Sequence, residues 1–528
     1  MDFYTEIIEL IIEKKINTKM DLHKLKIKLC KKYNISVVPP DSEILARLPV
    51  DFDDDEREMM VNLLRKKSMR TISGVAIVAV MTSPESCPHG MCIPCPGGPL
   101  SGTPQSYTGH EPAALRASLN DFDPFLQTSN RIKQLQVIGH RTDKVDFIIM
   151  GGTFTARNPY YQEWFVKRCY DALNQVESEN LSDAMKYNEK ADSRCIGLTV
   201  ETRPDWFRLR HIDQVLGFGA TRVELGVQTV YDDILYDIKR GHTVADSIIA
   251  TRESKESGLK VCYHMMPGLP GSSWERDVEC FQTIFEDTGF KPDMIKIYPT
   301  LTIKGTPLYD MWKEGRYTPL STEDASNLIA ELKTLVPEWV RIQRIQRDVP
   351  SQYIDAGVDK SNLRQLVIKE LRSHGKECRC IRCREIGHKS LCEKIEFTDE
   401  DISLNNSFYE ASDSEEAFIS LDVEKYDGLL GYLRLRDIQN PHRHELQENP
   451  CMMIRELKVV GRELSVGEKS KKGFQHKGYG KELVKEAERI SLEEYDKHCL
   501  YVLSGVGVKE YYRKLGFQDH GVYLYKKI

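Results

Sequence analysis

The stretch Cys87-Pro-His-Gly-Met-Cys92-Ile-Pro-Cys95 decides how the rest of this chain is interpreted. Its three cysteines have C-x4-C-x2-C spacing and come shortly after an apolar segment typical of a strand, residues 74–81. Cysteine thiolate is the usual ligand of iron–sulfur clusters, so this loop can hold three irons of a 4Fe–4S cube and leave the fourth iron open to a small molecule. A zinc loop and three unrelated thiols are the competing interpretations, but zinc normally takes four ligands.

The composition is that of a globular protein with room for two or three domains: 528 residues, 40% hydrophobic and 29% charged. No apolar run approaches the roughly 20 residues of a membrane span, and the first residues lack the basic start and apolar core of a signal peptide. We therefore expect a cytoplasmic protein that does not enter membranes, with its 14 cysteines reduced or bound to metal. The net charge of −6 does not indicate RNA binding, which would need local basic patches.

From about residue 71 to residue 350, apolar strands alternate with amphipathic helical stretches. Repeated β–α units with right-handed crossovers build a parallel sheet. We expect a closed or partly open (β/α) barrel with active residues at the carboxyl ends of its strands. The predicted strands are Val75–Met81, Val145–Met150, Ile196–Val200, Arg222–Val227, Lys260–Met266, Met294–Tyr298 and Val340–Ile345.

Glycine and acidic residues collect at the ends of these strands. Gly151 and Gly152 end the second strand, Glu201 ends the third, and Glu224 lies in the fourth. Turn chemistry alone explains such residues in many proteins. Together with a cysteine loop on the first strand, they resemble the SAM pocket of the radical SAM family. That resemblance implies that Gly151 and Gly152 let the backbone approach the amino group of SAM, and that Glu201 and Glu224 contact SAM.

A second cysteine group, Cys378, Cys380 and Cys383, follows the predicted barrel. One further ligand would complete the four-ligand set of structural zinc. The sequence leaves Cys392, His374 and His388 as candidates for that ligand. A second iron–sulfur cluster and a loop of free thiols are the alternatives.

A glycine-rich loop near the C-terminus, Gln475-His-Lys-Gly478-Tyr479-Gly480-Lys481, opens a helix predicted over 482–490. Backbone N–H groups at a helix start form a site for pyrophosphate. Strands are predicted at 418–421, 429–436 and 499–503, and Leu515-Gly516-Phe517 follows a tyrosine pair. In this order, the region resembles the GNAT acetyltransferases.

The GNAT resemblance implies that acetyl-CoA binds to this part of the chain. The backbone of Glu456, Leu457, Lys458 and Val459 would pair with the pantetheine arm. Tyr512 would approach the thioester sulfur as a catalytic residue, although its ordinary pKa of about 10 favours positioning over proton transfer. The residues that would hold the CoA phosphates are Gln475, Gly478, Tyr479, Gly480 and Lys481.

A radical SAM barrel fused to a GNAT domain resembles the Elongator catalytic-subunit family, as do the stretches Gln105–Gly109 and Met150–Thr153. The resemblance implies an α/β fold: a partial (β/α) TIM-like barrel, a C-terminal α/β GNAT domain and a small basic helical extension at the N-terminus. The predicted domains are a tRNA-contacting extension over 1–70, the barrel over 71–373, a cysteine-rich zinc linker over 374–395 and the GNAT domain over 396–528.

The family resemblance also implies an activity, tRNA wobble-uridine carboxymethyl synthesis. A 4Fe–4S cluster on Cys87, Cys92 and Cys95 would cleave SAM to a 5′-deoxyadenosyl radical, which takes a hydrogen from the methyl group of acetyl-CoA. The resulting carbon radical would add to C5 of the uridine, and hydrolysis of the thioester would leave 5-carboxymethyluridine. Lys144 matches a family lysine that contacts acetyl-CoA. Because water exposure would quench a carbon radical, we expect both cofactor sites to share one closed cleft.

The implied partners are the anticodon stem–loop of tRNA and an electron donor, and a homodimer is left open. Basic residues that could contact phosphates lie in two lysine-rich helices predicted over 1–36, in Arg65–Arg70, and at Arg341, Arg344 and Arg347. A solvated helical face explains the first group equally well. Candidates for stacking on a splayed base are Tyr107, Tyr298 and Tyr317.

Two other functions are compatible with the same residues. A protein lysine acetyltransferase with a structural iron–sulfur domain would use the CoA loop and Glu456 as its base. A tRNA-binding scaffold without turnover would form no 5′-deoxyadenosine. An intact cysteine loop and glycine pair have no purpose in simple acyl transfer, which favours the carboxymethyl synthase.

Overall fold

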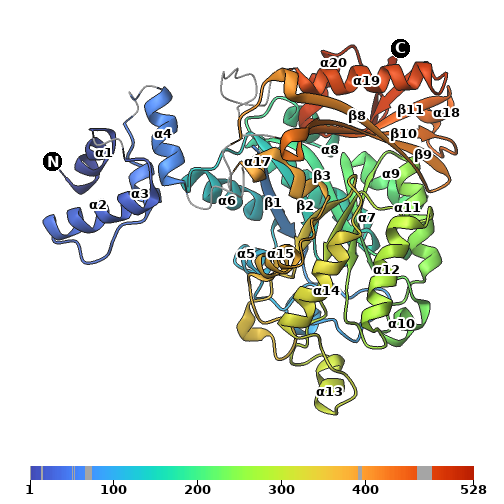
Figure 1. Cartoon of the computed structure of the whole chain (residues 1–528), viewed down its shortest axis with the longest axis horizontal. Helices are drawn as coiled ribbons and strands as arrows, with labels where there is room; N and C mark the ends of the chain where they lie inside the picture. The colour runs from blue at the N-terminus through green and yellow to red at the C-terminus, as the bar shows by residue number, and fades with distance from the viewer. Residues whose placement is uncertain are drawn as a thin grey trace.

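The structure is a computed structural model that describes residues 2–13, 16–49, 52, 54–65, 74–390, 395–460 and 478–528. In these ranges the strands form two sheets of seven. Figure 1 shows the first sheet with its helices below the second sheet, and the first four helices standing to one side. None of the helices in the described ranges is both long and apolar enough to cross a membrane.

The first sheet is the predicted barrel in its open form. Its strands are all parallel and lie in chain order, and within residues 74–390 no pairing joins the last strand to the first, so the sheet is a half-barrel. The strands are β1 (Ala76–Met81), β2 (Lys144–Met150), β3 (Arg194–Thr202), β4 (Ala220–Gln228), β5 (Lys260–Met265), β6 (Met294–Ile297) and β7 (Arg341–Ile345). These bounds confirm the seven predicted strands to within two residues at each end.

Helices cover the outer face of the half-barrel. Side chains alternate between the two faces of a strand, and the apolar ones that point outward need this cover. On β2, Val145, Phe147 and Ile149 are buried in the apolar core beneath the helices. The helices of this layer and of the strand-end loops are α5 (Pro112–Ser118), α6 (Pro124–Val137), α7 (Pro159–Asn174), α8 (Leu181–Asn188), α9 (Leu209–Gly217), α10 (Asp232–Asp237), α11 (Val244–Glu256), α12 (Trp274–Glu286), α13 (Pro307–Lys313), α14 (Thr322–Thr334) and α15 (Leu363–Ser373).

The inner face of the half-barrel is charged, whereas closed barrels of this type are usually filled with branched apolar side chains. Asp146 of β2 accepts hydrogen bonds of 3.2 Å from Arg222 of β4. Glu224, two residues further along β4, is fully buried and paired with Lys296 of β6. Buried charges must be paired, and each of these pairs reaches across the strand that lies between its two members, β3 in one case and β5 in the other.

The second sheet has the strand order β13-β14-β12-β11-β10-β9-β8 and is antiparallel except between β11 and β12. Its strands are β8 (Ile402–Ala411), β9 (Ser414–Val423), β10 (Gly428–Ile438), β11 (Cys451–Val459), β12 (Cys499–Val502), β13 (Gln518–His520) and β14 (Tyr523–Lys527). Three helices accompany it: α18 (His444–Gln447), α19 (Tyr479–Glu493) and α20 (Lys509–Arg513). This sheet confirms the predicted C-terminal α/β unit.

Three of these strands were not predicted, and their sequences explain why. The edge strand β8 reads Ile402-Ser-Leu-Asn-Asn-Ser, and most of its side chains are exposed or half-buried. Asparagine and serine are depleted in strands, so pairing with β9 must override the local preference. β13 and β14 are short and rich in charged or polar residues.

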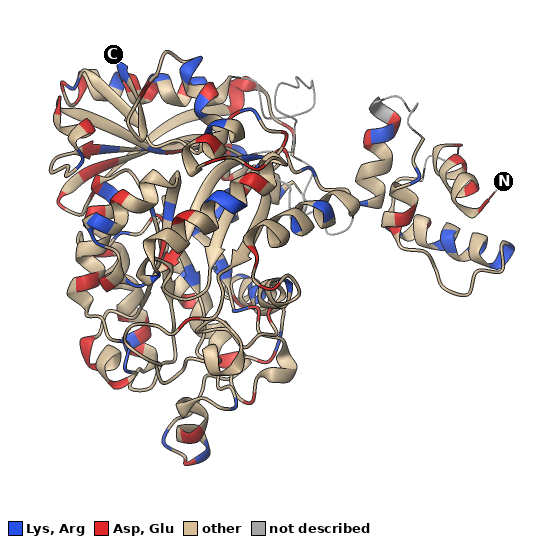
Figure 2. Cartoon of the chain, turned by 180° about the vertical axis from the view of Figure 1, so that it is seen from behind, with Lys and Arg blue, Asp and Glu red and all other residues tan. Residues whose placement is uncertain are grey.

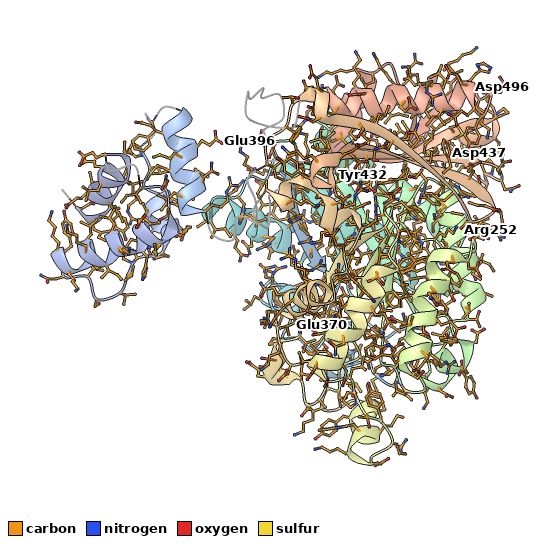
Figure 3. All side chains as sticks on the ribbon, in the orientation of Figure 1. Arg252, Glu370, Glu396, Tyr432, Asp437 and Asp496 are labelled. Atoms are coloured by element: carbon orange, nitrogen blue, oxygen red, sulfur yellow. The ribbon has the colours of Figure 1, made fainter. Side chains whose placement is uncertain are left out.

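The second sheet packs on the amino ends of the half-barrel strands. Tyr432 of β10 lies on the side of the sheet that faces the half-barrel (Figure 3) and belongs to a cluster packed against Trp339. Gly505, before α20, lies so close to β3 that a Cβ there would be 2.1 Å from the carbonyl oxygen of Ile196. At the rim, Arg252 of α11 pairs with Asp413 at 3.4 Å.

The first four helices, α1 (Phe3–Glu13), α2 (Lys19–Lys32), α3 (Asp41–Leu45) and α4 (Asp54–Leu64), have an apolar cluster of their own. Arg65 links them to the half-barrel by donating a 2.8 Å hydrogen bond to the carbonyl of Gly139. Two short helices, α16 (Ile381–Arg384) and α17 (Ile386–Lys389), lie between the two sheets. The predicted helices of the extension are confirmed, while the four domain boundaries stay predictions.

Candidate active site

A pocket of about 160 Å³ lies at the carboxyl ends of the half-barrel strands. It is the place where the fold brings the first cysteine group together with the strand-end residues. Of the predicted site residues, those that line it are Cys87, Cys92, Cys95, Gly152, Glu201 and Glu224. Tyr107, Tyr298, Arg344 and Arg347 line it as well, but Tyr317 does not.

Each cysteine of the pocket has a polar neighbour at its sulfur. Cys87 lies 3.5 Å from the hydroxyl of Thr153, and Cys95 accepts a 3.2 Å hydrogen bond from the amide of Gln105. Cys92 contacts Arg240 at 3.7 Å. Burial raises the pKa of the Cys87 and Cys92 thiols, so a bound metal and these donors would have to stabilise the thiolates.

The two cysteine groups differ in the distances between their sulfur atoms. A single zinc ion binds sulfur at about 2.3 Å, which requires its ligand atoms to lie close together. Among the described residues, the sulfurs of Cys378, Cys380 and Cys383 all lie within 4.8 Å of one another, and those of Cys87, Cys92 and Cys95 form no such group. The wider set fits a cluster, in which each thiolate binds a different iron.

The two glycines after β2 have different positions. Both have a positive φ, +128° for Gly151 and +90° for Gly152. A Cβ on Gly151 would lie 2.1 Å from the hydroxyl of Thr82, so this glycine allows β1 and β2 to end side by side. Gly152 lines the pocket, and a Cβ there would lie 3.7 Å from the sulfur of Cys87.

The two acidic residues are held by a lysine that was not predicted. Lys296 of β6 contacts Glu224 and lies 3.7 Å from Glu201. His264 lies 2.8 Å from Glu224, and Tyr107 donates a 2.9 Å hydrogen bond to Glu201. Burial raises the pKa of Glu224, but Lys296 and His264 outweigh that effect and hold it below its usual range.

Glu201, Glu224 and His264 could by geometry hold a metal ion, since their ligand atoms lie within 4.8 Å of one another. The ammonium of Lys296 already occupies the charge-neutralising position beside both carboxylates. Lys296 is a single lysine in the apolar strand Met-Ile-Lys-Ile, and a charged residue on a buried strand is the signal that could have identified it.

The predicted acetyl-CoA residues lie at the other end of the half-barrel. Glu456 of β11 accepts a 2.9 Å hydrogen bond from Arg434 and interacts electrostatically with Lys260, the first residue of β5. Lys144 is the first residue of β2 and therefore also lies at the amino end. None of these residues lines the cysteine pocket. The two predicted sites therefore lie at opposite ends of the half-barrel strands, and the single closed cleft stays a prediction.

The CoA loop is described only from Gly478 onward, and Gln475 lies outside the described residues. Gly478 caps α19 with a φ of +99°, and a Cβ on Gly480 would lie 2.6 Å from the hydroxyl of Tyr511. The side chain of Tyr479 is buried and donates a 2.8 Å hydrogen bond to Asp399. Tyr512 is buried against Phe517, with ring centres 5.8 Å apart.

Some of the residues predicted to contact tRNA or zinc are accessible in the structure, and others are buried or lie outside the described residues. Arg341 is held by Glu385 in an ion pair with a side chain only 13% exposed, so it is a poor candidate for a tRNA phosphate. Lys28 and Lys31 of α2 are exposed (Figure 2 colours the lysines of this helix). Cys392 and Lys66–Arg70 lie outside the described residues. Neither His374 nor His388 joins the Cys378 group within the described residues.

Four family models match the chain. They are the ELP3 N-terminal domain over residues 1–72, the Radical SAM superfamily over 84–284, the Radical SAM C-terminal domain over 292–373 and the Acetyltransferase (GNAT) family over 387–517. A protein from Methanocaldococcus jannaschii named tRNA uridine(34) acetyltransferase is 52% identical over 92% of this chain and 90% of its own length. Elongator complex protein 3 of Homo sapiens is 42% identical over 99% of this chain and 96% of its own length.

The chain belongs to the Elongator complex protein 3 family. A solved structure of an archaeal member, Methanocaldococcus infernus Elp3 with an N-terminal deletion, matches with a TM-score of 0.78 and 48% identity, over 87% of this chain and 100% of that one. The radical SAM and GNAT parts of the Elongator complex protein 3 family imply SAM, a 4Fe–4S cluster and acetyl-CoA as cofactors. The donor-surrounded cysteines of the pocket fit the cluster.

Proposed function

We propose that this chain converts U34 of tRNA, the wobble uridine, to 5-carboxymethyluridine, using SAM and acetyl-CoA in the cytoplasm. The observation that carries the proposal is the three-cysteine pocket on a half-barrel whose other end carries an acetyltransferase sheet. Acyl transfer alone would need only the second part. The name of the Methanocaldococcus jannaschii relative, tRNA uridine(34) acetyltransferase, supports the substrate.

In the pocket, Cys87, Cys92 and Cys95 would hold the cluster, which supplies the electron that cleaves SAM. The residues around it then position SAM. The backbone at Gly152 would receive the amino group, because this residue lines the pocket and has no side chain of its own. Glu201 and Glu224 present carboxylates whose orientation is fixed by Lys296.

At the amino end, the strand Glu456, Leu457, Lys458 and Val459 would pair with the pantetheine arm. The start of α19 would take the pyrophosphate, through Gln475 and Gly478–Lys481. Burial raises the pKa of Tyr512, which keeps its hydroxyl protonated and able to orient the thioester. Lys144 would contact acetyl-CoA from the half-barrel.

The lumen of the half-barrel would connect the two ends. Its side chains are polar along the whole length, from Asp146 and Arg222 to Glu224. Thr199 Oγ1 and Arg222 Nε are buried and have no hydrogen-bond partner in the described residues. Such groups are suited to contacting the amide groups of a pantetheine arm, so we place that arm in the lumen during the reaction.

The proposed reaction balances in atoms and electrons. With the cluster held by Cys87, Cys92 and Cys95, cleaved SAM would supply the radical that removes one hydrogen from the acetyl methyl group, and that carbon would form a C–C bond to C5 of uracil. The uracil would then give its C5 proton to solvent and one electron back to the cluster, which balances the electron spent on SAM. Water then cleaves the thioester and releases CoA. An electron donor is needed only to prime the enzyme.

A lysine acetyltransferase is the weaker candidate because its predicted base, Glu456, is engaged by other side chains. A general base works best with a pKa near the working pH. Burial raises the pKa of Glu456, but Arg434 and Lys260 lower it below its usual value overall. Its side chain is 11% exposed and bonded to Arg434, so it is not available to a substrate lysine.

We also propose that Cys378, Cys380 and Cys383 bind structural zinc. Their sulfurs have the close spacing that one ion needs. Cys380 is the N-cap residue of α16, which packs on both β7 and β10. An ion here would join the two sheets.

The test is an anaerobic assay. The reconstituted enzyme is mixed with dithionite, SAM, acetyl-CoA and unmodified tRNA, and the digested nucleosides are analysed by mass spectrometry. We expect 5-carboxymethyluridine and 5′-deoxyadenosine, both absent with Cys92→Ser. Release of CoA without either product would contradict the proposal and direct attention to protein lysines.

A further inference from the structure

An ion pair on the wall of the cysteine pocket is not among the residues assigned above to the cluster or to SAM. Arg344, next to the end of β7, pairs with Asp348, and both side chains line the pocket. They are 36% and 49% exposed. An ordinary ion pair at such exposure contributes little to stability. Its position therefore calls for a role in binding.

Hydrogen bonds of the neighbouring residues fix the orientation of the Arg344–Asp348 pair. Gln346 lies between the two residues with a φ of +77°. Its backbone N–H donates a 2.8 Å hydrogen bond to the carbonyl of Ile297, and its side-chain amide donates a 2.7 Å bond to the carbonyl of Lys360. The left-handed turn brings Asp348 back beside Arg344. Arg347 ties the same turn to the carbonyl of Ser106, in the loop that follows the cysteines.

The pair offers one donor and one acceptor side by side. Uracil presents the complementary pattern on its Watson–Crick edge, because the carbonyl O4 accepts and N3–H donates. Cytosine reverses both positions, with a donating amino group and an accepting N3. Proteins that read single-stranded RNA commonly hold such an edge with side chains and stack the base on an aromatic ring.

From this arrangement we propose that Arg344 and Asp348 read the Watson–Crick edge of the target uracil, Arg344 donating to O4 and Asp348 accepting from N3–H. C5 lies on the other edge of the ring, so this contact leaves the reacting carbon facing the rest of the pocket. Tyr298 lines the same wall, and its ring meets that of His264 at 5.4 Å. The inference deepens the proposed function and rests on it.

The test compares anticodon stem–loops that carry uridine, cytidine or 3-methyluridine at position 34. Carboxymethylated nucleoside and 5′-deoxyadenosine are both quantified. With the unsubstituted enzyme, we expect cytidine and 3-methyluridine to react at least about tenfold more slowly than uridine, in line with the worth of a good base contact. Asp348→Asn can present a donor to N3 of cytosine, so it should reduce the uridine-to-cytidine ratio at least about tenfold.

Arg344→Lys keeps the positive charge but loses the forked guanidinium group, and it should also reduce the uridine-to-cytidine ratio. The matched control is Glu314→Gln, which breaks an exposed ion pair with Arg316 outside the pocket and should leave the ratio unchanged. A wild-type ratio in both pocket variants, even with slower reaction on every RNA, would overturn the inference while the proposed function stands. Absence of any modified uridine with the unsubstituted enzyme would overturn the proposed function and this inference with it.

Discussion

Two fully buried carboxylates, one at each end of the half-barrel, have different surroundings. Asp293, before β6, is saturated: both of its oxygens accept from Arg455, and one accepts from the backbone N–H of Val261. Glu224, in the pocket, uses one oxygen for Lys296 and His264. Its other oxygen has no hydrogen-bond partner in the described residues and only a 3.8 Å contact with Arg222.

This difference separates a carboxylate that joins the two sheets from a carboxylate that faces the cysteine pocket. Buried polar groups are nearly always hydrogen-bonded, and an exception needs an explanation. At the amino end, Arg434, Arg436 and Arg455 join the two sheets through carboxylates and backbone carbonyls. Buried side-chain atoms without a hydrogen-bond partner in the described residues occur at both ends: in Arg434 and Arg455 at the amino end, and in Glu224, Gln228 and Arg240 at the carboxyl end. Of the two carboxylates, only Glu224 keeps such an atom, and it is there that a ligand of the pocket can add its own hydrogen bond.

Cys92→Ser should have the largest effect, because it removes a ligand of the cluster. We expect complete loss of 5′-deoxyadenosine formation and of most bound iron, measured by product analysis and metal analysis. Zinc content should stay unchanged, since Cys378, Cys380 and Cys383 are a separate group. Cys280→Ala, at a buried cysteine away from both groups, is the matched control. Retained iron and activity in Cys92→Ser would refute the cluster assignment.

Asp293→Asn should destabilise the interface between the two sheets. It leaves Arg455 buried with a weakened partner, and loss of one member of a buried ion pair typically costs about 3–5 kcal/mol. Denaturant unfolding should register this loss as a lower midpoint. Asp233→Asn, which breaks an exposed pair with Arg276, should cost no more than about 1 kcal/mol. Equal losses in the two variants would mean that the interface charges are not structural.

Lys255 gives the amino end a pH dependence. Burial lowers the pKa of this lysine to about 8, although Glu416 partly opposes the shift. Between pH 8 and the unfolded pKa of about 10.4, the unfolded chain holds a proton that the folded chain has lost. Stability should therefore rise with pH across this window by up to about 3 kcal/mol, and be constant below it with respect to this group. In Lys255→Met this part of the rise should disappear, as pH-resolved unfolding would show; an unchanged profile would argue against a depressed pKa.

Glu224→Gln should act on function more than on stability. The glutamine keeps the shape of the side chain but removes the charge that holds Lys296. We therefore expect the rate of SAM cleavage to fall by about tenfold, which corresponds to an increase of about 1.4 kcal/mol in the activation free energy. Its cost in unfolding free energy should be smaller than that of Asp293→Asn, because Lys296 still has Glu201. Glu279→Gln, at an exposed glutamate, is the control. A larger loss of stability in Glu224→Gln than in Asp293→Asn would contradict the distinction between the two carboxylates.

Much of this could be predicted from the sequence because the decisive signals are local. Strand periodicity located β1–β7, and cysteine spacing located both sulfur groups. The predicted strand Val145–Met150 already places Lys144 at a strand start, but the placement of Glu456 at the amino end could not be predicted, since it depends on how the second sheet docks. The role of Lys296 was also missed: its partners Glu201 and Glu224 come from other strands. Pairings across a lumen arise only when the sheet curves, and no local pattern encodes them.

Deuterium tracing would test the central claim most directly. The enzyme would be given acetyl-CoA with a fully deuterated methyl group, together with SAM and unmodified tRNA. The account predicts one deuterium in 5′-deoxyadenosine and two in the carboxymethyl group of the uridine. Unlabelled 5′-deoxyadenosine, or an intact deuterated acetyl group on protein or RNA, would contradict it.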